Sequence, residues 1–435
     1  MTDGADTIVA VATPPGVGGI GVLRLSGPRA LELGARIAGP LPPARRALRR
    51  SFRDPEGAPL DDGLVLVFPG PASYTGEDVV ELQGHGSPVL LQRLQEVAVD
   101  LGARLARPGE FTERAFLNGR MDLAQAEAVA DLIHAQTAAA ARLARNSLDG
   151  ALAETIDPVA REIRDLRVLI EAEIDFGETD LESAVAPEVA RRAGELARSV
   201  DALVARMRPA RIFTTGMRLA LIGAPNVGKS SLMNRLAHAE VAIVTEVAGT
   251  TRDVLRAPIA IDGIPVELID TAGLRDSDDA VERIGIERAR SAAAAADMIL
   301  EIRDLTRPEA CADFPDLPGI PVLRVWNKAD LASGGAPGGL RVSAVTGEGL
   351  DALRAAIRAE MGLGTGQEQR FSVRARHLET LAQAAACLHR ILPESPPDLI
   401  AEDLRLAERA LEQLLGRGDH EALLGAIFAG FCIGK

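Results

Sequence analysis

The sequence predicts a multidomain chain of the α+β and α/β classes, with a nucleotide-binding P-loop domain inserted into a discontinuous helical domain. Three observations lead to this prediction. Strand-like runs alternate with proline- and glycine-rich turns in the first part of the chain. Amphipathic helical patterns flank the middle part, which carries a phosphate-binding loop between a strand and a helix. A length of 435 residues is sufficient for two or three domains.

The predicted N-terminal domain covers residues 1–118 and is a mixed α+β domain. Clusters of proline and glycine, which favour turns, separate its strand-like runs. These runs are at residues 7–12, 20–25, 64–68 and 79–82.

A helical domain is predicted in two pieces, at residues 119–212 and 366–435. Asp122 is the predicted N-cap of its first helix. Neither piece is long enough to form a stable domain alone, so we expect the two to pack together. Apolar residues recur at three- and four-residue spacing over 124–146, 158–174, 374–392 and 399–415.

The inserted domain, predicted at residues 213–365, contains the phosphate-binding loop GAPNVGKS at 223–230. A strand is predicted before the loop and a helix after it, which is the context that this motif requires. Backbone N–H groups and the helix N-terminus would bind the phosphates. Lys229 is expected to bridge the outer phosphates, and the Ser230 hydroxyl is expected to bind Mg²⁺.

Two switch-like motifs follow. TTRD at 250–253 places Thr251 where it would reach Mg²⁺. DTAG at 270–273 ends the second strand of a predicted hairpin whose turn is Asp262-Gly263. Asp270 would hold Mg²⁺ through water, and the Gly273 N–H would meet the γ-phosphate.

Two base-binding motifs complete the set. NKAD at 327–330 follows a predicted strand at 321–326, and the Asp330 carboxylate would accept from the N1–H and amino group of guanine. SAV at 343–345 would close over the base, with the Ala344 N–H as the donor to guanine O6.

Together these motifs predict a GTP site. Its predicted residues are Asn226, Val227, Gly228, Lys229, Ser230, Ser231, Thr245, Glu246, Val247, Ala248, Gly249, Thr250, Thr251, Asp270, Thr271, Ala272, Gly273, Asn327, Lys328, Ala329, Asp330, Ser343, Ala344 and Val345.

One position departs from the most familiar GTPases. Leu274 follows the DTAG motif, where Ras-like enzymes place the glutamine that orients the attacking water. A leucine side chain forms no hydrogen bond with water, so another group must position it.

The composition indicates a helix-rich globular protein with an acidic surface. The chain is 47% hydrophobic and 3% aromatic, and its formal net charge is −14. This charge disfavours nucleic acid as the dominant partner, because phosphate contacts supply most of the non-specific affinity. An RNA substrate would need a local basic patch or a partner protein, and a surface kept acidic for solubility is equally compatible.

The sequence also bears on location. No apolar run reaches the length of a membrane span, and the N-terminus lacks the features of a secretion signal. A disulfide framework is not expected, because Cys311, Cys387 and Cys432 are few and far apart. We therefore expect a cytoplasmic protein without a membrane partner.

The chain resembles the MnmE family of tRNA-modification GTPases, also called TrmE, over essentially its whole length. The resemblance is carried by ATPPG at 12–16, GEDVVEL at 76–82, RPGEF at 107–111, DLAQAE at 122–127, AGTTRD at 248–253, ERIGIE at 282–287 and FCIGK at 431–435. The C-terminal motif FCIGK is the most specific of these.

The resemblance implies a homodimer joined through N-terminal domains that are similar to folate-binding one-carbon domains. With the partner MnmG, in a heterotetramer, the family adds an aminomethyl or carboxymethylaminomethyl group to C5 of the wobble uridine, position 34, of certain tRNAs. FAD belongs to the partner, which would also hold most of the tRNA. The one-carbon unit comes from a tetrahydrofolate derivative, of the 5-formyl or methylene type.

The resemblance also assigns roles to residues of the nucleotide domain. K⁺ would supply the positive charge of an arginine finger when two nucleotide domains meet. Glu282 would order the attacking water, although on its own a glutamate at a helix start suggests a solvated or capping residue. The implied K⁺ ligands are Asn226, Thr245, Val247 and Thr250.

The implied folate site consists of Arg24, Glu81, Arg120 and Lys435. On their own these residues suggest surface or ion-paired positions. Arg120 stands where relatives often have lysine, so the charge is kept while the contact geometry differs. Cys432 lies near this site in the sequence, and an inert buried thiol is a better interpretation than a nucleophile.

Two other functions are compatible with the motifs. A ribosome-assembly or RNA-binding GTPase has similar motifs, but such proteins usually carry a basic RNA-binding domain, which this acidic chain does not suggest. The other is a regulatory switch that binds a protein partner and contributes no one-carbon chemistry.

Overall fold

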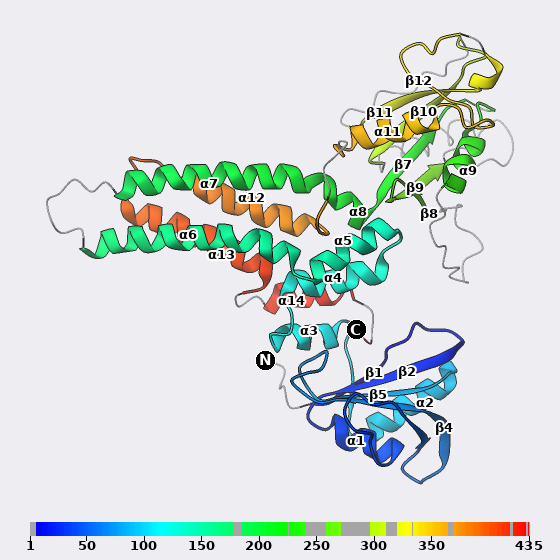
Figure 1. Cartoon of the computed structure of the whole chain (residues 1–435), viewed down its shortest axis with the longest axis vertical. Helices are drawn as coiled ribbons and strands as arrows, with labels where there is room; N and C mark the ends of the chain where they lie inside the picture. Colours follow the sequence, from blue (N-terminus) through cyan, green and yellow to red (C-terminus); the bar gives the residue numbers. More distant parts are fainter. Residues whose placement is uncertain are drawn as a thin grey trace, which may run out of the picture. The chain divides into compact units, whose positions relative to one another are not determined.

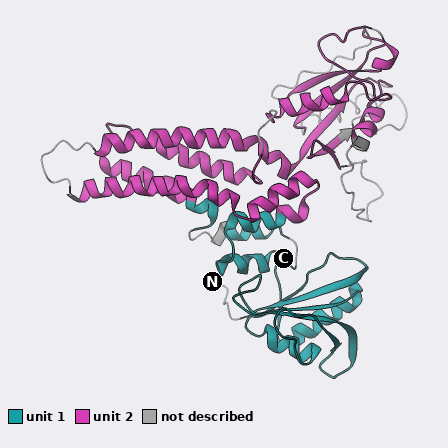
Figure 2. Ribbon diagram, viewed as in Figure 1, with its two compact units in different colours: residues 1–130, 412–435 teal, residues 131–411 magenta. Residues whose placement is uncertain are grey.

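Two compact units make up the chain (Figure 2). Unit 1 consists of residues 1–130 and 412–435, and unit 2 consists of residues 131–411. The predicted domain boundaries near residues 118, 212 and 365 remain predictions. The computed structural model describes residues 6–176, 185–224, 226–239, 258–270, 296–309, 320–332, 334–363, 369–417, 421–431 and 434.

Unit 1 contains a six-stranded sheet with the strand order β3-β4-β5-β2-β1-β6 (Figure 1). Neighbouring strands are antiparallel, except that β1 and β6 are parallel. The four predicted strands correspond to β1, β2, β4 and β5. The bounds are β1 (Ile8–Val11), β2 (Gly18–Ser26), β3 (Leu48–Arg53), β4 (Pro59–Phe68), β5 (Val79–Gly86) and β6 (Arg104–Leu105).

Alternation along the strands divides the core of unit 1 between the two faces of the sheet. Val9 and Leu25 pack with α1 (Ala30–Ala38) and α2 (Pro88–Asp100). Ile8 and Ala10 belong to a second cluster with Phe111 of α3 (Glu110–Leu117). Side chains that alternate along β1 are therefore buried against helices on both faces of the sheet.

The C-terminal segment belongs to unit 1. Phe428 of α14 (Glu421–Phe428) and Phe431 pack against Leu123 and Ala126 of α4 (Leu123–His134). Asp122 caps α4 as predicted: its Oδ1 accepts from the Gln125 N–H at 2.7 Å, and Gln125 Oε1 accepts from the Asp122 N–H at 2.9 Å. This reciprocal pair satisfies two N–H groups at the start of the helix.

The helical pattern over residues 124–146 is divided into two helices. Thr137 adopts extended backbone angles and is the N-cap of α5 (Ala138–Leu148), where its hydroxyl accepts from the Ala140 N–H. The apolar spacing continues across this break, so periodicity alone did not predict it. A threonine that caps a helix must leave helical geometry, which ends α4 before it.

Four long helices of unit 2 lie side by side (Figure 1). They come from both sides of the inserted domain: α6 (Ala151–Phe176), α7 (Val185–Met207), α12 (Ala375–His389) and α13 (Pro397–Leu415). The buried Glu408 carboxylate of α13 accepts from Arg164 of α6 at 2.7 Å and pairs with Arg167 at 3.0 Å. The predicted packing of two sequence-distant helical pieces is therefore confirmed.

The inserted domain contains a second six-stranded sheet, with the order β12-β11-β10-β7-β9-β8. All neighbours are parallel except β8 and β9, which form the predicted hairpin around Asp262-Gly263. The strands are β7 (Met217–Ile222), β8 (Pro258–Ile261), β9 (Ile264–Asp270), β10 (Met298–Asp304), β11 (Val322–Asn327) and β12 (Leu340–Arg341).

Short helical segments complete this domain. Leu232 and Leu236 of α9 and Leu353 and Ile357 of α11 pack against the sheet. The segments are α8 (Arg211–Thr215), α9 (Lys229–Ala239), η2 (Ala329–Leu331) and α11 (Leu350–Glu360), and η1 (Arg208–Ala210) connects α7 to α8.

Within the described part of the chain, no helix combines the length and apolar character that a bilayer crossing requires.

Candidate functional site

Strand register brings the predicted nucleotide motifs to one edge of the second sheet. The parallel strands β10 and β11 end together, with Asp304 opposite Asn327, and β7 ends beside them with Ile222 opposite Glu301. The first strand, β7, has β9 on one side and β10 on the other. Ligands of open α/β sheets bind at the carboxyl edge, where the strand order reverses in this way.

The phosphate-binding loop connects β7 to α9 at this edge, as predicted. Asn226 is exposed and has a left-handed backbone, with φ of 62°. Gly228 has φ of 94°, and a Cβ atom there would lie 2.3 Å from the Asn327 side-chain nitrogen. Position 228 therefore requires glycine both for its backbone angle and for the space that Asn327 occupies.

Lys229 lies within the curve of the loop. Its side chain is largely buried, and the ammonium group donates to the carbonyl oxygens of Gly223 at 2.7 Å and Ala224 at 3.0 Å. The charge is thus held beside the backbone that would surround the phosphates. Ser230 and Ser231 are exposed in the first turn of α9.

Asn327 ties the base-binding motifs to the phosphate-binding loop. Its Nδ2 donates to the Val227 carbonyl oxygen at 2.8 Å, and its Oδ1 accepts from the Ala344 N–H at 3.0 Å. Only 2% of the residue is exposed. One buried amide therefore connects three motifs that the sequence presents separately.

The Ala344 contact bears on the predicted base contact. This N–H, expected to donate to guanine O6, already has Asn327 Oδ1 as an acceptor. A bond to O6 would therefore have to be shared with that acceptor.

A hydrogen bond from Ser343 orients the predicted guanine-reading carboxylate. Asp330 is exposed, and its Oδ1 accepts from the Ser343 hydroxyl at 2.5 Å. The same hydroxyl accepts from the N–H groups of Val345 and Thr346. Ser343 is fully buried, so the loop holds its hydroxyl in one orientation.

Asp304 is a residue of this edge that the motifs did not predict. Its Oδ2 accepts from Lys328 Nζ at 2.6 Å, which fixes the lysine of the NKAD motif. Burial raises the pKa of Asp304, but bonds from Lys328 and Thr306 outweigh burial and lower the pKa below its ordinary value. The available signal was its position at the carboxyl end of a strand that neighbours β11.

Several predicted site residues lie outside the described part of the chain, as do Leu274 and Cys432. For Asp270 the backbone at the end of β9 is described, and its side chain is not. The others are Thr245, Glu246, Val247, Ala248, Gly249, Thr250, Thr251, Thr271, Ala272, Gly273, Glu282 and Lys435.

A second cluster, in unit 1, contains the predicted folate residues Arg24 and Glu81. They are opposite each other on β2 and β5, and Arg24 donates to Glu81 Oε1 at 3.0 Å. Arg24 also donates to the Gly434 carbonyl oxygen at 3.4 Å. Strand pairing and the C-terminal segment thus converge on one guanidinium group.

Two aromatic residues that the sequence did not predict flank Arg24. Its guanidinium carbon lies 5.7 Å from the ring centre of Tyr74 and 5.6 Å from that of Phe111. Tyr74 is the single tyrosine of the chain. Burial raises the pKa of its phenol, which therefore stays neutral and bonds the Thr112 hydroxyl at 2.8 Å.

Arg120 follows α3 and is exposed. A Cβ atom on Gly76 would lie 3.4 Å from its Cγ, so the arginine is beside the loop that carries Tyr74. Asn118 fastens the same loop by donating to the Thr75 carbonyl oxygen at 2.7 Å.

Comparison with known proteins adds five matches. A family model described as the GTP-binding protein TrmE N-terminus matches residues 7–120, and one described as the MnmE helical domain matches residues 123–432. The tRNA modification GTPase MnmE of Alkalilimnicola ehrlichii is 48% identical in an alignment of 442 residues that covers 99% of each of the two chains. The G domain of the T. maritima FeoB iron transporter is 24% identical over 34% of this chain and 98% of its own, with a TM-score of 0.23. A GTP-binding protein from Sulfolobus solfataricus in complex with GDP is 17% identical over 47% of this chain and 67% of its own, with a TM-score of 0.25.

Proposed function

Because the chain belongs to the MnmE family of tRNA modification GTPases, we propose that it couples GTP hydrolysis to modification of the wobble uridine, position 34, of certain tRNAs. The added group is an aminomethyl or carboxymethylaminomethyl group on C5. The one-carbon unit comes from a tetrahydrofolate derivative. The partner is MnmG, which carries FAD and holds most of the tRNA.

The observation that carries the nucleotide part of this proposal is the pair of hydrogen bonds that the Asn327 side chain makes with Val227 and Ala344. It holds the phosphate-binding loop and the base-binding loop together at the carboxyl edge of the sheet. Asp330, oriented by Ser343, reads guanine. Mg²⁺ is held by the hydroxyl groups of Ser230 and Thr251, a donor chemistry that suits this ion.

Hydrolysis without the usual glutamine needs two further groups. Glu282 orders the attacking water, because Leu274 has no polar atom with which to do so. Asn226, Thr245, Val247 and Thr250 would hold K⁺, which would supply positive charge near the γ-phosphate when two nucleotide domains meet. The exposed, left-handed Asn226 supports this role, because its amide is on the accessible side of the loop.

The tetrahydrofolate derivative that supplies the one-carbon unit is proposed to bind around Arg24 and Glu81. The pair presents a carboxylate for ring N–H groups and a cation for folate carboxylates, next to two aromatic rings. Arg120 and Lys435 add positive charge at the same site.

The proposed homodimer is joined through the N-terminal domain. Apolar side chains that are unusually exposed support this surface: Val17 is 93% exposed, Ile20 is 68% exposed and Val89 is 76% exposed. Val17 immediately precedes β2, Ile20 lies where the pairing of β2 with the end of β5 is irregular, and Val89 follows that end in α2. Exposed apolar side chains gathered in this way are typical of protein interfaces.

A joint between α5 and the β8–β9 hairpin supports the proposed coupling of nucleotide state to the helices. The Thr137 hydroxyl, which caps α5, also donates to the Gly263 carbonyl oxygen at 2.7 Å. A Cβ atom on Gly263 would lie 2.7 Å from that of Ala139, so only glycine permits this approach. Strand β9 runs from this hairpin directly to Asp270, at the nucleotide edge.

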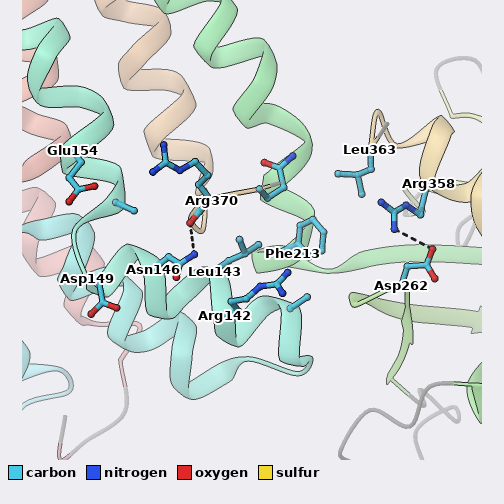
Figure 3. Close-up of a pocket in the computed structure, with 13 residues that line it drawn as sticks. Arg142, Leu143, Asn146, Asp149, Glu154, Phe213, Asp262, Arg358, Leu363 and Arg370 are labelled. Carbon is cyan, nitrogen blue, oxygen red and sulfur yellow. Dashed lines mark hydrogen bonds and ion pairs between the residues drawn. The ribbon is translucent and has the colours of Figure 1, made fainter. Parts of the chain in front are cut away.

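A cavity of about 720 Å³ lies beside this joint (Figure 3). Figure 3 shows the ion pair between Arg358 and Asp262, 3.3 Å apart, and the bond from Asn146 to the Arg370 carbonyl oxygen. The space gives the hairpin room to shift against α5. A change at Asp270 would then reach the helices through β9.

The one-carbon proposal is tested by titrating the full chain with 5-formyltetrahydrofolate. We expect Arg24→Gln to weaken binding at least tenfold, while Arg29→Gln, which removes an arginine paired with Glu32 at the surface, leaves it unchanged. Equal affinity in the Arg24 variant and the native chain would exclude the assigned site. Undetectable binding to the native chain would favour a regulatory switch without one-carbon chemistry.

A further inference from the structure

An arginine-rich segment of unit 1 differs in charge from the rest of the chain. Residues 45–53, RRALRRSFR, contain five arginines and no acidic residue, whereas the whole chain has a net charge of −14. We call these five residues the arginine strand, because they lie on β3 and the turn before it. They are Arg45, Arg46, Arg49, Arg50 and Arg53.

The arginine strand lies at an edge of the sheet. Among the described strands, β3 is the last in the order and pairs only with β4, so no described strand lies on its other side. Four of the five arginines are exposed, and Arg50 is half-buried. Successive side chains of a strand alternate between its two faces, so Arg49 and Arg50 on β3 spread positive charge over both sides of this edge.

Backbone carbonyls orient several of these side chains without neutralising them. Arg45 donates to the Ala72 carbonyl oxygen, Arg50 to that of Pro40 at 2.9 Å, and Arg53 to that of Gly57 at 2.9 Å. A carbonyl group holds a guanidinium in place and leaves its full positive charge.

Arg49 alone among the five has a carboxylate within 4.0 Å in the described part of the chain. That partner is Asp62, at 3.4 Å, and both side chains are exposed. An exposed pair at this distance contributes little binding energy and is readily exchanged for another anion.

Several other arginines of unit 1 are neutralised by carboxylates. Arg24 pairs with Glu81, Arg104 with Glu110 and Arg114 with Glu77, at 2.5 to 3.1 Å. The concentration of unneutralised charge on β3 is therefore a local feature and not a general property of the unit.

We propose that the arginine strand binds the phosphate backbone of tRNA, so that this chain holds part of the tRNA itself. The inference rests on the proposed function, which makes a tRNA the substrate. Arginine forms paired hydrogen bonds with phosphate oxygens, which suits backbone contacts better than a protein surface. An acidic chain also repels RNA at long range, so any contact must be made by a local cationic surface of this kind.

Protection of an open sheet edge is the competing explanation, since charged side chains on edge strands prevent edge-to-edge association. The two explanations differ in what the charges are for. Edge protection predicts self-association when the arginines are removed, whereas tRNA binding predicts a loss of affinity that depends on salt.

The test compares full-length variants in their affinity for fluorescently labelled tRNA between 50 and 200 mM salt. The triple variant Arg46→Gln, Arg49→Gln and Arg53→Gln should lower the salt slope by about 2.7, because each lost phosphate contact removes about 0.9. Over this fourfold salt range, the native chain should lose about 40-fold more affinity than the triple variant. The corresponding triple lysine variant keeps the charges and should keep the slope.

The matched control removes Arg29, which is also exposed but makes two hydrogen bonds to the Glu32 carboxylate, at 2.8 and 2.9 Å. This control should change the slope by less than half as much per charge. An unchanged slope in the triple variant, an equal loss in the control, or self-association at unchanged tRNA affinity would each overturn the inference. The inference would also be overturned if the native chain did not bind tRNA. A polyaspartate probe that bound the arginine strand more tightly than tRNA does would overturn it as well.

GTP hydrolysis is measured in the same samples. It should be unchanged in every variant, because none of these residues lies in the nucleotide domain. A native chain that does not hydrolyse GTP would contradict the proposed function instead, so the two failures are distinguishable.

Discussion

Replacing Asn327 with alanine tests how the nucleotide site is held together. The substitution removes the side-chain N–H that donates to the Val227 carbonyl oxygen and the side-chain oxygen that accepts from the Ala344 N–H. Both groups are buried, with Val227 5% exposed and Ala344 9% exposed. A buried polar group left without a partner costs about 1–3 kcal/mol, so the two together should cost about 2–6 kcal/mol, with the lower values where water enters.

Part of this cost should appear in nucleotide binding, because the two loops contact opposite ends of the same ligand. We expect GDP affinity to fall at least about tenfold, which corresponds to about 1.4 kcal/mol, and the remainder to lower the free energy of unfolding. Titration with a fluorescent GDP analogue measures the first quantity, and urea unfolding measures the second.

Asn146→Ala is the matched control. Among the described residues its amide makes one hydrogen bond, a solvent-exposed one to the Arg370 carbonyl oxygen, away from the nucleotide edge. We expect about 1 kcal/mol or less of destabilisation and no change in GDP affinity. An Asn327 variant with GDP affinity within twofold of the native chain and an unchanged free energy of unfolding would show that Asn327 does not hold the two loops together.

Three further predictions concern hydrolysis and acid stability. Glu282→Ala should abolish GTP turnover while GDP affinity is kept, and an unchanged turnover number in single-variant kinetics would exclude the assigned role. Sodium in place of potassium should slow turnover about tenfold or more, as a missing transition-state cation would; equal rates in the two salts would remove the ion from the mechanism. Burial raises the pKa of Glu110, but hydrogen bonds from Arg104 and the Arg107 N–H outweigh burial and lower the pKa below 4.5. The ionised Glu110 therefore stabilises the fold fully above its unfolded pKa of 4.5, and this stabilisation is lost as pH falls through the lower pKa of the folded state. Urea unfolding of Glu110→Gln should therefore show lower stability at pH 7 and a weaker loss between pH 5 and 3, and parallel curves for variant and native chain would contradict this.

Local features of the fold were predictable from the sequence because they depend on neighbouring residues. The cap at Asp122 needs only Gln125, three positions later. The hairpin at Asp262-Gly263 needs only residues that accept positive φ angles, here 50° and 81°. The phosphate-binding loop was placed correctly between β7 and α9 for the same reason.

Strand β3 had no counterpart among the predicted elements. Arginine occupies three of its six positions, so only Phe52 gives an inward-facing apolar signal. An edge strand buries little, and its pairing with β4 supplies the stability that its own apolar content does not.

Contacts between distant segments explain what the motifs missed at the sites. Asp304 meets Lys328 only because β10 and β11 are parallel and in register. Tyr74 and Phe111 reach Arg24 from a loop and from α3, which no spacing rule connects. The predicted residues were recognised as motifs, whereas their supporting side chains are defined by tertiary structure.

Calorimetric titration of the full chain with GDP, with Mg²⁺ present, tests whether the inserted domain is a guanine-nucleotide site. We expect that GDP binds and ADP does not, and that Asp330→Asn shifts preference from GDP toward xanthosine diphosphate, whose ring accepts where guanine donates. Heat of binding that is equal for GDP and ADP, or absent for both, would contradict it.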